Sequence, residues 1–423
     1  MQRLTSLDAW LARLERLHPS TIDLGLDRVR RVKDALGLVP DFPLIIVGGT
    51  NGKGSTSAYL AAILDAAGYK TGLYTSPHLL RYNERVRVAG REAGDAELIA
   101  AFERVDAARD DVSLTYFEFG TLGAMARFID AGIDVAVLEV GLGGRLDAVN
   151  VFDADVAVVT SVDLDHMDYL GDSREKIGFE KAGIYRAGRP AICVDPAPPV
   201  SLLEHARRIG ADLRCVDRDF SAQREDDHWT YRSLGTGWTE LPLPAMAGAC
   251  QLRNASGALA ALEAIQDRLP VDVAAIRRGL AATHVPGRFQ YIAQAPAVIL
   301  DVAHNPEAAR ALAATLRSQP VGGRTLAVVG MLADKDAAGV FAALCDEIDA
   351  WWTCTPASSR ARDARALAAV LRGQMGEAPI HVQPDVVRAL AEARSAARED
   401  DRILIFGSFY TVAAVLDHAA TQQ

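Results

Sequence analysis

Short apolar segments alternate with longer segments of helical periodicity along most of the chain from Leu44 onward. A short apolar run bounded by polar residues is typical of a buried strand, and an amphipathic segment between two such runs is typical of a crossover helix. The alternation therefore predicts an α/β fold with a mostly parallel sheet. The strands expected in this first series are 44–47, 71–74, 135–140, 156–161 and 191–194, and the helices between them include 117–131, 174–185 and 202–209.

Segments of a different character lie on either side of this first series. Ahead of it, apolar spacing predicts a helix at 7–17, and a polar loop at 20–28 leads into a second helix. After it, short aromatic and β-branched pieces between about 213 and 244 predict a small antiparallel sheet, which a helix at 251–268 follows.

A second α/β series begins after the segment 286–289, Pro-Gly-Arg-Phe, in which proline and glycine predict a hinge. This series has no glycine-rich loop with a lysine of its own. We therefore expect it to close over a ligand that the first series holds. Its expected strands are 298–302, 325–331, 350–355, 380–383 and 402–406, and its helices include 307–318, 364–372 and 386–398.

The composition of the chain fits a large enzyme with more than one domain. Half of its 423 residues are hydrophobic, and its formal net charge of −10 argues against a nucleic-acid or anionic-membrane partner but not against small anionic substrates. No apolar run is long enough to span a bilayer, and the N-terminal residues lack the apolar stretch of a signal peptide, so we expect a cytoplasmic protein. The five cysteines are dispersed without a Cys-x-x-Cys pair, which predicts neither a disulfide framework nor a zinc site.

The first expected strand leads directly into a glycine-rich loop at 49–55, Gly-Thr-Asn-Gly-Lys-Gly-Ser, and then into a helical segment. Glycines let backbone N–H groups close around oxyanions, and a helix N-terminus adds positive potential. Lys53 is placed to reach the outer phosphates of a nucleotide, and the hydroxyl residues after it are placed to face a metal ion. The strict phosphate-loop pattern is broken, because Val47 occupies its first glycine position and Gly54 precedes the hydroxyl. A plain strand-to-helix turn is the alternative to nucleotide binding.

Polar residues also follow the ends of the next strands. Ligands of open parallel sheets bind beyond the carboxyl ends of the strands, so these residues are candidates for one site. Ser76, Glu139 and His166 offer oxygen and nitrogen ligands suited to a magnesium nucleotide. Their alternative roles are a turn cap for Ser76, an exposed acid for Glu139 and a structural position for His166. The glycines at 141, 143 and 144 lack the Gly-x-Gly-x-x-Gly spacing of a dinucleotide loop, which favours tight packing near a substrate over NAD binding.

Two further candidates carry weak local signals. Lys181 lies in a helical segment beside Glu180, and its spacing alone indicates a solvated helix lysine. In the second series, Asp301 and His304 follow a strand end, where Asp301 is suited to accept from ribose hydroxyls and His304 to approach a transferring phosphate. The Asp-x-x-His spacing by itself is not specific.

Taken together and in this order, the motifs resemble those of the folylpolyglutamate synthase and dihydrofolate synthase family, a branch of the Mur ligase superfamily. The extra Gly54 that breaks the general phosphate-loop pattern is a feature of that family. The resemblance spans nearly the whole chain. Its segments are 21–28, 49–55, 75–78, 138–148, 165–166, 180–184, 286–289, 301–306 and 407–409.

The resemblance implies an architecture and an activity. A P-loop-type, mostly parallel ATPase domain at 1–287 would carry an N-terminal pterin-binding segment, and a smaller Rossmann-like domain at 288–423 would be the glutamate ligase domain. Family members join L-glutamate to a carboxylate on a pterin compound, through an acyl phosphate that forms as ATP is cleaved. The implied acceptors are dihydropteroate and reduced folates. The implied cofactors are ATP and two Mg²⁺ ions, with K⁺ as a further candidate, and we expect a monomer.

The resemblance also implies roles for individual residues. It makes Lys181 an N6-carboxylysine near the second metal ion, which reverses its interpretation as a solvated lysine. It assigns catalytic roles to Lys53, Lys181 and His304, metal binding to Ser76, Glu139 and His166, and ATP binding to Thr50, Asn51, Gly52, Lys53, Gly54, Ser55, Asn254, Arg288 and Asp301. Dihydropteroate binding is implied for Thr21, Ile22, Asp23, Leu24, Thr115, Tyr116, Phe117, Glu118, Leu146, Asp147 and Ala148.

Three alternatives stay open on the sequence. Asp23 or Thr21 is also suited to cap the helix that follows it. A ligase for peptidoglycan precursors would have the same fold and metals with a uridine nucleotide substrate, although the segment 21–28 argues against it. A nucleotide-binding regulator without catalysis would keep the loop at 49–55 and make no use of Glu139 and His166.

Overall fold

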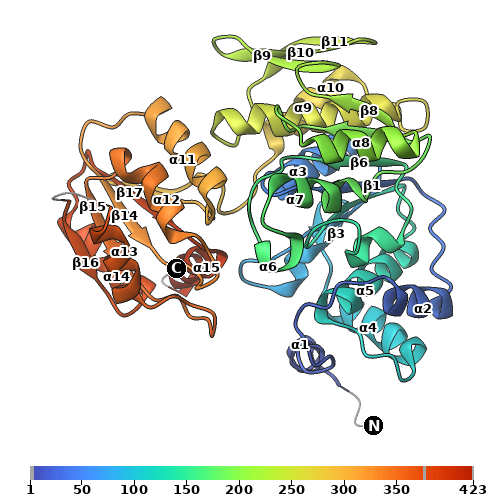
Figure 1. Ribbon diagram of the computed structural model, residues 1–423, viewed down its shortest axis with the longest axis horizontal. Coiled ribbons are helices and arrows are strands. Elements are labelled where there is room, and N and C mark those ends of the chain that lie inside the picture. The colour runs from blue at the N-terminus through green and yellow to red at the C-terminus, as the bar shows by residue number, and fades with distance from the viewer. Residues whose placement is uncertain (1–3, 375–377, 422–423) are drawn as a thin grey trace. The chain divides into compact units, whose positions relative to one another are not determined.

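The computed structural model describes residues 4–374 and 378–421. The chain divides into two compact units (Figure 1). The first comprises Met1–Ala245 and Leu252–Thr283, and the second comprises Met246–Gln251 and His284–Gln423. Sequence patterning did not indicate that the short segment Met246–Gln251 belongs with the second unit, because the two parts of that unit are far apart in the chain.

An eight-stranded sheet forms the centre of the first unit, in the order β4-β3-β2-β5-β1-β6-β7-β8. The six strands from β2 to β8 in this order are parallel, and the pairs β2–β3 and β3–β4 are antiparallel. The apolar runs predicted the inner strands because both faces of these strands are buried. The strands are β1 (Leu44–Gly48), β2 (Thr71–Tyr74), β3 (Val86–Val88), β4 (Arg91–Glu92), β5 (Val135–Glu139), β6 (Val156–Val159), β7 (Pro190–Cys193) and β8 (Asp212–Cys215).

Helices cover this sheet (Figure 1). Leu44 and Ile46 of β1 lie in one hydrophobic cluster with Phe119 and Ile177 from two of the helices. The helix that follows the glycine-rich loop is buried on nearly all sides and contacts β1, β2 and β5. The helices of this unit are α1 (Leu7–Leu14), α2 (Asp27–Leu36), α3 (Lys53–Ala66), α4 (Asp95–Arg109), α5 (Tyr116–Ala131), α6 (Met167–Leu170), α7 (Arg174–Ala182), α8 (Val200–Ile209), α9 (Ala249–Ala264, whose first residues belong to the second unit) and α10 (Val273–Ala282).

A separate antiparallel sheet of three strands follows β8, as the aromatic and β-branched segment predicted. It consists of β9 (Phe220–Arg224), β10 (His228–Ser233) and β11 (Gly237–Pro242). The start expected at about 213 is wrong, because Leu213 pairs with Ala191 in the large sheet. Polar and apolar residues alternate in the short strand β8, which is why the sequence pattern did not separate this strand from the small sheet.

The second unit contains a six-stranded sheet in the order β12-β13-β17-β14-β15-β16. All pairs are parallel except β12 with β13. Its strands are β12 (Gln290–Gln294), β13 (Ala297–Leu300), β14 (Thr325–Val329), β15 (Ala350–Thr353), β16 (Ile380–Val382) and β17 (Arg402–Phe406), and its helices are α11 (Pro306–Ser318), α12 (Ala337–Leu344), α13 (Ala364–Arg372), α14 (Val386–Ala396) and α15 (Phe409–Thr421). The predicted α/β class, with a larger mostly parallel sheet followed by a smaller α/β unit, is confirmed.

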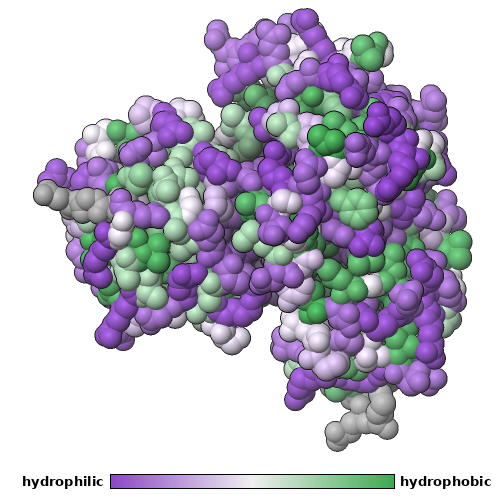
Figure 2. Space-filling view, in the orientation of Figure 1, coloured by the Kyte–Doolittle hydropathy of each residue, from purple (hydrophilic) through white to green (hydrophobic). Residues whose placement is uncertain are grey.

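Hydrophilic residues cover most of the face shown in Figure 2, and hydrophobic residues occur there in scattered groups. Across residues 4–374 and 378–421, none of the helices combines the length and the apolar character needed to cross a membrane.

Candidate active site

The glycine-rich loop joins β1 to α3 and depends on glycine at two positions. Gly49 and Gly52 have φ angles of +144° and +87°, which residues with a side chain rarely adopt. A Cβ atom at Gly49 would collide with the hydroxyl of Thr160, and one at Gly52 would collide with the side-chain oxygen of Asn254. The fold thus brings Asn254, which α9 carries, directly against the loop.

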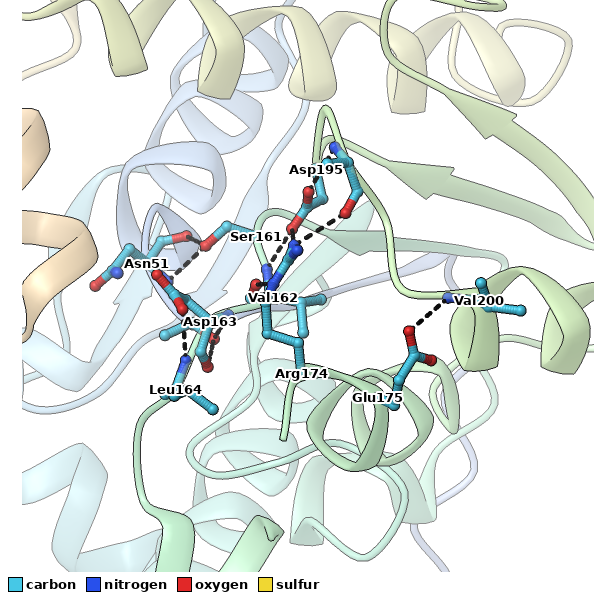
Figure 3. Close-up of polar contacts among 11 residues, drawn as sticks. Asn51, Ser161, Val162, Asp163, Leu164, Arg174, Glu175, Asp195 and Val200 are labelled. Atoms are coloured by element: carbon cyan, nitrogen blue, oxygen red, sulfur yellow. Dashed lines mark hydrogen bonds and ion pairs between the residues drawn. The ribbon is translucent and has the colours of Figure 1, made fainter. Parts of the chain in front are cut away.

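The segment after β6 anchors this loop (Figure 3). The N–H of Asn51 donates to the Ser161 hydroxyl at 3.0 Å, and the N–H of Thr50 donates to the Ser161 carbonyl at 2.8 Å. The Thr50 hydroxyl donates to the carbonyl of Asp163 at 3.1 Å and accepts from its N–H at 3.0 Å. These contacts fasten Thr50 and Asn51 of the loop to the segment that follows β6.

A second layer of contacts supports the anchoring segment. The carboxylate of Asp195, two residues beyond β7, accepts from the N–H of Val162 at 2.7 Å and pairs with Arg174 at 3.1 Å (Figure 3). Arg174 also donates to the Val162 carbonyl at 2.7 Å. Neither residue was predicted from the sequence as part of the site, although the position of Asp195 just after a strand is the signal that singled out Glu139.

Helix α3 begins at this loop without a side-chain cap, because its N-cap residue is Gly52. The ammonium of Lys53 donates to the carbonyl oxygens of Gly49 and Thr50, both at 3.1 Å, and so lies at the loop. Ser55 and Thr56 are buried in the first turn. Uncapped N–H groups and a lysine at one helix end are the arrangement that binds phosphate, so these residues fit a nucleotide.

Glu139 ends β5 and is only 4% exposed, so its alternative role as an exposed acid is wrong. Its Oε2 atom accepts from the backbone N–H of Ser76 at 3.1 Å, which brings two predicted metal ligands together. His166 has a φ of +51° at the start of α6, and its N–H donates to the Asp165 carboxylate at 2.9 Å. It therefore belongs to the same post-β6 segment that anchors the loop.

Within residues 4–374 and 378–421, no three side chains of the His, Cys, Asp and Glu types lie close enough together to hold a metal ion. Of the three predicted metal ligands, Glu139 and His166 belong to these residue types, and the third ligand is the hydroxyl of Ser76. This set fits an ion that draws its remaining ligands from nucleotide phosphates and water, which is the usual way magnesium binds in such enzymes.

Lys181 is 3% exposed on α7, so its interpretation as a solvated lysine is wrong. The loop after β5 covers this part of the helix. A Cβ atom at Gly144 would lie 2.8 Å and 3.0 Å from the carbonyl oxygens of Glu180 and Lys181. Arg145 in the same loop donates from its N–H to the Glu180 carbonyl at 2.8 Å and pairs with the Glu180 carboxylate at 2.8 Å. The close glycine packing that the sequence analysis favoured is therefore present.

The segment 21–24 forms a loop between α1 and α2 and is tied to the N-terminus of α5. Arg28 makes both ties, with its guanidinium 2.8 Å from Asp23 and 3.1 Å from Glu118. His18 adds a contact of 3.1 Å to Asp23. Asp23 and Thr21 do not cap α2, because its N-cap residue is Leu26 and no side-chain cap is formed. Ile22 and Leu24 are half-buried in the same loop.

The segment 115–118 begins α5, where Thr115 and Glu118 form a capping box. Phe117 of the first turn packs against the loop after β5, because a Cβ atom at Gly141 would lie 2.6 Å from its ring. Asp147 in that loop is buried between Leu146 and Ala148, and its carboxylate accepts from the N–H groups of Leu142 and Val149. The first turn of α5 and the loop around Asp147 therefore lie side by side.

The carboxyl of Asp147 titrates in an unusual range. Burial raises its pKa to about 7, although backbone hydrogen bonds and the charge of Lys53 act in the opposite direction. The influence of Lys53 connects this carboxyl electrostatically to the glycine-rich loop. Near neutral pH, Asp147 is able to present either a protonated or an ionised oxygen to a ligand.

Residues of the second unit form a cluster of their own beyond β13 and β17. The Asp301 carboxylate accepts from the N–H groups of Phe289 at 2.9 Å and Ala303 at 2.8 Å. Burial raises the pKa of Asp301, and the positive charge of Arg288 opposes this shift. His304 Nδ1 lies 2.8 Å from the Val302 carbonyl. The fold thus brings Arg288, Asp301 and His304 into one cluster.

Phe409 completes this cluster. The guanidinium of Arg288 lies 5.4 Å from the centroid of the Phe409 ring, and the ring of His304 lies 6.2 Å from it. A guanidinium over an aromatic face is a cation–π contact that fixes the orientation of the arginine. The motif 407–409 from the sequence therefore supports the side chains that follow β13.

Comparisons with known proteins agree with this architecture. Residues 47–197 match the Mur ligase middle domain, and residues 287–409 match the Mur ligase, glutamate ligase domain. The dihydrofolate synthase/folylpolyglutamate synthase of Escherichia coli (strain K12) is 46% identical over 417 residues, which cover 98% of this chain and 96% of that protein.

Solved structures match as closely. An E. coli structure in complex with DHPP and ADP has a TM-score of 0.95 and 45% identity, and the match covers 100% of this chain and 99% of that one. The bifunctional folylpolyglutamate synthase/dihydrofolate synthase of Yersinia pestis, in complex with AMPPNP and Mn, has a TM-score of 0.91 and 43% identity, with both chains fully covered. The chain therefore belongs to the dihydrofolate synthase/folylpolyglutamate synthase family of ATP-dependent Mur ligases.

Proposed function

We propose that this protein adds L-glutamate both to 7,8-dihydropteroate, which gives dihydrofolate, and to tetrahydrofolate polyglutamates. The observation that carries the dual activity is the bridge that Arg28 makes between Asp23 and Glu118. This bridge joins the two segments implied to bind dihydropteroate, 21–24 and 115–118. It lies in the same unit as the phosphate-type loop that is proposed to hold the nucleotide.

The first half of the proposed reaction activates the acceptor. A carboxylate is a poor electrophile, so an oxygen of the acceptor carboxylate attacks the γ-phosphate of ATP, and ADP leaves. The loop residues from Thr50 to Ser55, with Asn254, hold the phosphates, and Lys53 offsets the charge that develops on them. Ser76, Glu139 and His166 would hold two Mg²⁺ ions, and K⁺ is a further candidate. When bound, these cations neutralise phosphate charge.

The second half forms the amide. The amine of L-glutamate attacks the acyl carbon, the nitrogen loses a proton, and inorganic phosphate leaves. Arg288 and Asp301 would hold the nucleotide from the second unit, and His304 would contact the γ-phosphate. In this proposal residues 1–287 form the ATP- and pterin-binding domain, and residues 288–423 form the glutamate ligase domain. A cytoplasmic monomer without nucleic-acid or membrane contacts is part of the same proposal.

Lys181 would carry a carboxyl group on Nζ. The match of Lys181 to the modified lysine of the family supports this proposal. Reaction of the amine with CO₂ would convert it into a carbamate anion with loss of a proton. The variant Lys181→Ala should be nearly inactive and should recover part of its activity when a short carboxylic acid such as acetate is added. Lys176→Ala is the matched control, because Lys176 lies on the same helix and pairs with Asp172 at the surface. Labelled bicarbonate should give a carbamate signal in the NMR spectrum of the wild type, and a plain amine would refute the modification.

The dual activity is tested by ATP-dependent phosphate release with L-glutamate and three acceptors. Dihydropteroate and tetrahydrofolate should both support turnover, and a muramoyl peptide precursor should not. Asp23→Ala should reduce turnover of dihydropteroate more than that of tetrahydrofolate, because Asp23 lies in the segment that the proposal assigns to dihydropteroate. Activity with tetrahydrofolate alone would remove the first reaction from the proposal. Activity with the muramoyl precursor would favour the peptidoglycan ligase, and no activity with any acceptor would favour the regulator.

A further inference from the structure

Arg85 lies at the C-terminal edge of the large sheet, beside the predicted metal ligands. It ends a short 3₁₀ turn just before β3, and its carbonyl accepts from the N–H of Thr75 at 2.9 Å. Thr75 directly precedes Ser76, whose N–H donates to Glu139. The backbone of Arg85 is therefore paired with the residue next to this group.

Three side chains hold the guanidinium of Arg85 in place. Its Nε atom donates to Nδ1 of His78 at 2.8 Å. Its Cζ atom lies 5.4 Å from the ring centroid of Tyr82 and 5.5 Å from that of Tyr116. Tyr116 belongs to the segment 115–118 that is implied to bind the acceptor. The arginine is thus fixed against the segment proposed to bind the acceptor.

The charge of Arg85 is not balanced within the fold. The arginines on either side of it, Arg81 and Arg87, pair with Asp95 and Glu92 at 3.3 Å each. For Arg85, residues 4–374 and 378–421 provide no carboxylate within ion-pair distance.

The nearest acid in the sequence, Glu84, does not fill this role. Its carboxylate accepts from the backbone N–H groups of Leu79, Leu80 and Arg81. Arg85 is half-buried, and its Nε atom donates to His78 rather than to a carboxylate.

The chemistry of an arginine in this position favours a carboxylate ligand. A guanidinium presents parallel N–H donors that match the two oxygens of a carboxylate, and such charge-assisted pairs are stronger than neutral hydrogen bonds. Cation–π contacts with two tyrosines orient the group but do not neutralise it. An anion from outside the fold would do so.

We propose that Arg85 binds a carboxylate of the acceptor substrate. The inference rests on the proposed function, which supplies an acceptor with such a group. The carboxylate is either the one that becomes joined to glutamate, which every acceptor has, or the α-carboxylate of the last glutamate, which only the longer acceptors have. Arg85 is then a specificity-determining residue of the acceptor site.

The test compares equilibrium binding of acceptors with and without a charge. Dihydropteroate and its uncharged carboxamide are titrated into the wild type, Arg85→Met and Arg85→Lys in the absence of ATP, as are tetrahydrofolate and its α-carboxamide. Arg87→Met is the matched control, because Arg87 lies on the same hairpin and already has a partner in Glu92. The wild type should prefer the carboxylate by about tenfold to a hundredfold, the range for a hydrogen-bonded ion pair.

Arg85→Met should lose this preference, Arg85→Lys should keep part of it, and Arg87→Met should behave as the wild type. Loss of preference with dihydropteroate identifies the reacting carboxylate, and loss confined to tetrahydrofolate identifies the α-carboxylate. In steady-state assays KM for the affected acceptor should rise, and KM for ATP should not change.

An unchanged carboxylate preference in Arg85→Met for both acceptors would overturn the inference, even if the variant were less stable, because a purely structural arginine would affect both ligands of a pair equally. If Arg85→Met kept its carboxylate preference while the wild type turned over the acceptors, the proposed function would stand and the inference about Arg85 would be rejected. Failure of the wild type to bind either charged acceptor would overturn both.

Discussion

The two units contain the same local arrangement, in which a parallel strand leads through a short loop into a helix, but the helix begins differently in each. Strand β1 leads into α3, whose N-cap residue is Gly52 and which has no side-chain cap. Strand β13 leads into α11, whose N-cap residue Asn305 accepts from the N–H of Ala308 at 2.9 Å. Pro306 at the first position of α11 has no N–H to satisfy.

This difference separates a helix end that is open to an anion from one that is already satisfied. The first N–H groups of a helix have no partner within the helix, so they bind a side chain, water or a ligand. At α11 the chain supplies the partner itself. At α3 it supplies glycines and Lys53 instead, an arrangement that suits the phosphate proposed to bind there. A strand–loop–helix connection is therefore not sufficient by itself to form a phosphate-binding site.

Two buried carboxylates, Asp401 and Asp147, also differ in how the fold satisfies them, although Asp301 of the second unit resembles Asp147 in having a raised pKa. In the second unit, Asp401 accepts from the backbone N–H groups of Arg324 and Arg398 and pairs with Arg324 at 2.7 Å. Burial acts to raise the pKa of Asp401, but these interactions lower it to about 2. In the first unit, burial prevails at Asp147 and raises its pKa to about 7. Asp401 thus has an arginine beside it that offsets the effect of burial on its pKa, whereas the backbone hydrogen bonds of Asp147 do not offset that effect.

The largest effect on activity is expected at Glu139, which is proposed to bind the metal ion. Glu139→Gln keeps the shape of the side chain and removes its charge. We expect the variant to lose about 2–4 kcal/mol of transition-state stabilisation, as for other lost electrostatic groups, and its turnover to fall accordingly. The fold should persist, because a strand-end ligand contributes little to the core. Steady-state kinetics and a thermal melt check the two parts. A near-normal rate would show that Glu139 is not a metal ligand.

A smaller effect should follow from closing the open helix end itself. Gly52→Ala places a Cβ atom against Asn254 at a φ of +87° and should raise KM for ATP at least about tenfold, because the loop has to shift away from its phosphate-binding shape. Gly37→Ala is the matched control. Gly37 also has a positive φ, of +63°, but nothing lies within 4 Å of its Cβ position. The control should lose stability and keep its affinity for ATP. Equal KM values for the two variants would mean that the loop does not hold the nucleotide.

The smallest effect is expected at the capped helix. Asn305→Ala removes the cap of α11 and should lower the free energy of unfolding by about 1 kcal/mol, the usual loss for such a cap. KM for ATP should change less than about twofold, because in the wild type the Asn305 side chain, and not a phosphate, satisfies this helix end. Urea unfolding and ATP titration measure the two quantities. A rise in KM as large as that of Gly52→Ala would show that both helix ends bind phosphate and would remove the contrast between the units.

The sequence predicted the inner strands and most helices because their patterns are local. An apolar run at 402–406 or an amphipathic segment at 364–372 is visible without knowledge of what covers it. It did not predict the short strands β3, β4 and β12 at or next to the sheet edges, whose residues are partly polar and whose pairing depends on a neighbour. Edge strands of this kind carry little hydrophobic signal.

The site residues divide in the same manner. The glycine-rich loop is recognisable from its own residues, because glycine and lysine at those positions have few other purposes. Lys181 is not, because the loop around Gly144 that covers its helix comes from another part of the chain. Only the resemblance to a family indicated that this lysine is unusual. The contacts of Arg28 and Arg85 depend likewise on residues distant in sequence and became visible only in the fold.

The segment after β6 is fastened to the glycine-rich loop at Ser161 and Asp163 and carries His166 three residues farther on. The number of residues in this segment therefore sets the distance between the anchoring residues and His166. Leu164 lies within this interval and is 42% exposed, so its identity is of little consequence. Substitution of residue 164 should therefore be tolerated. The insertion or deletion of a single residue there would change the distance between the anchoring residues and His166 and would disturb both parts of the site.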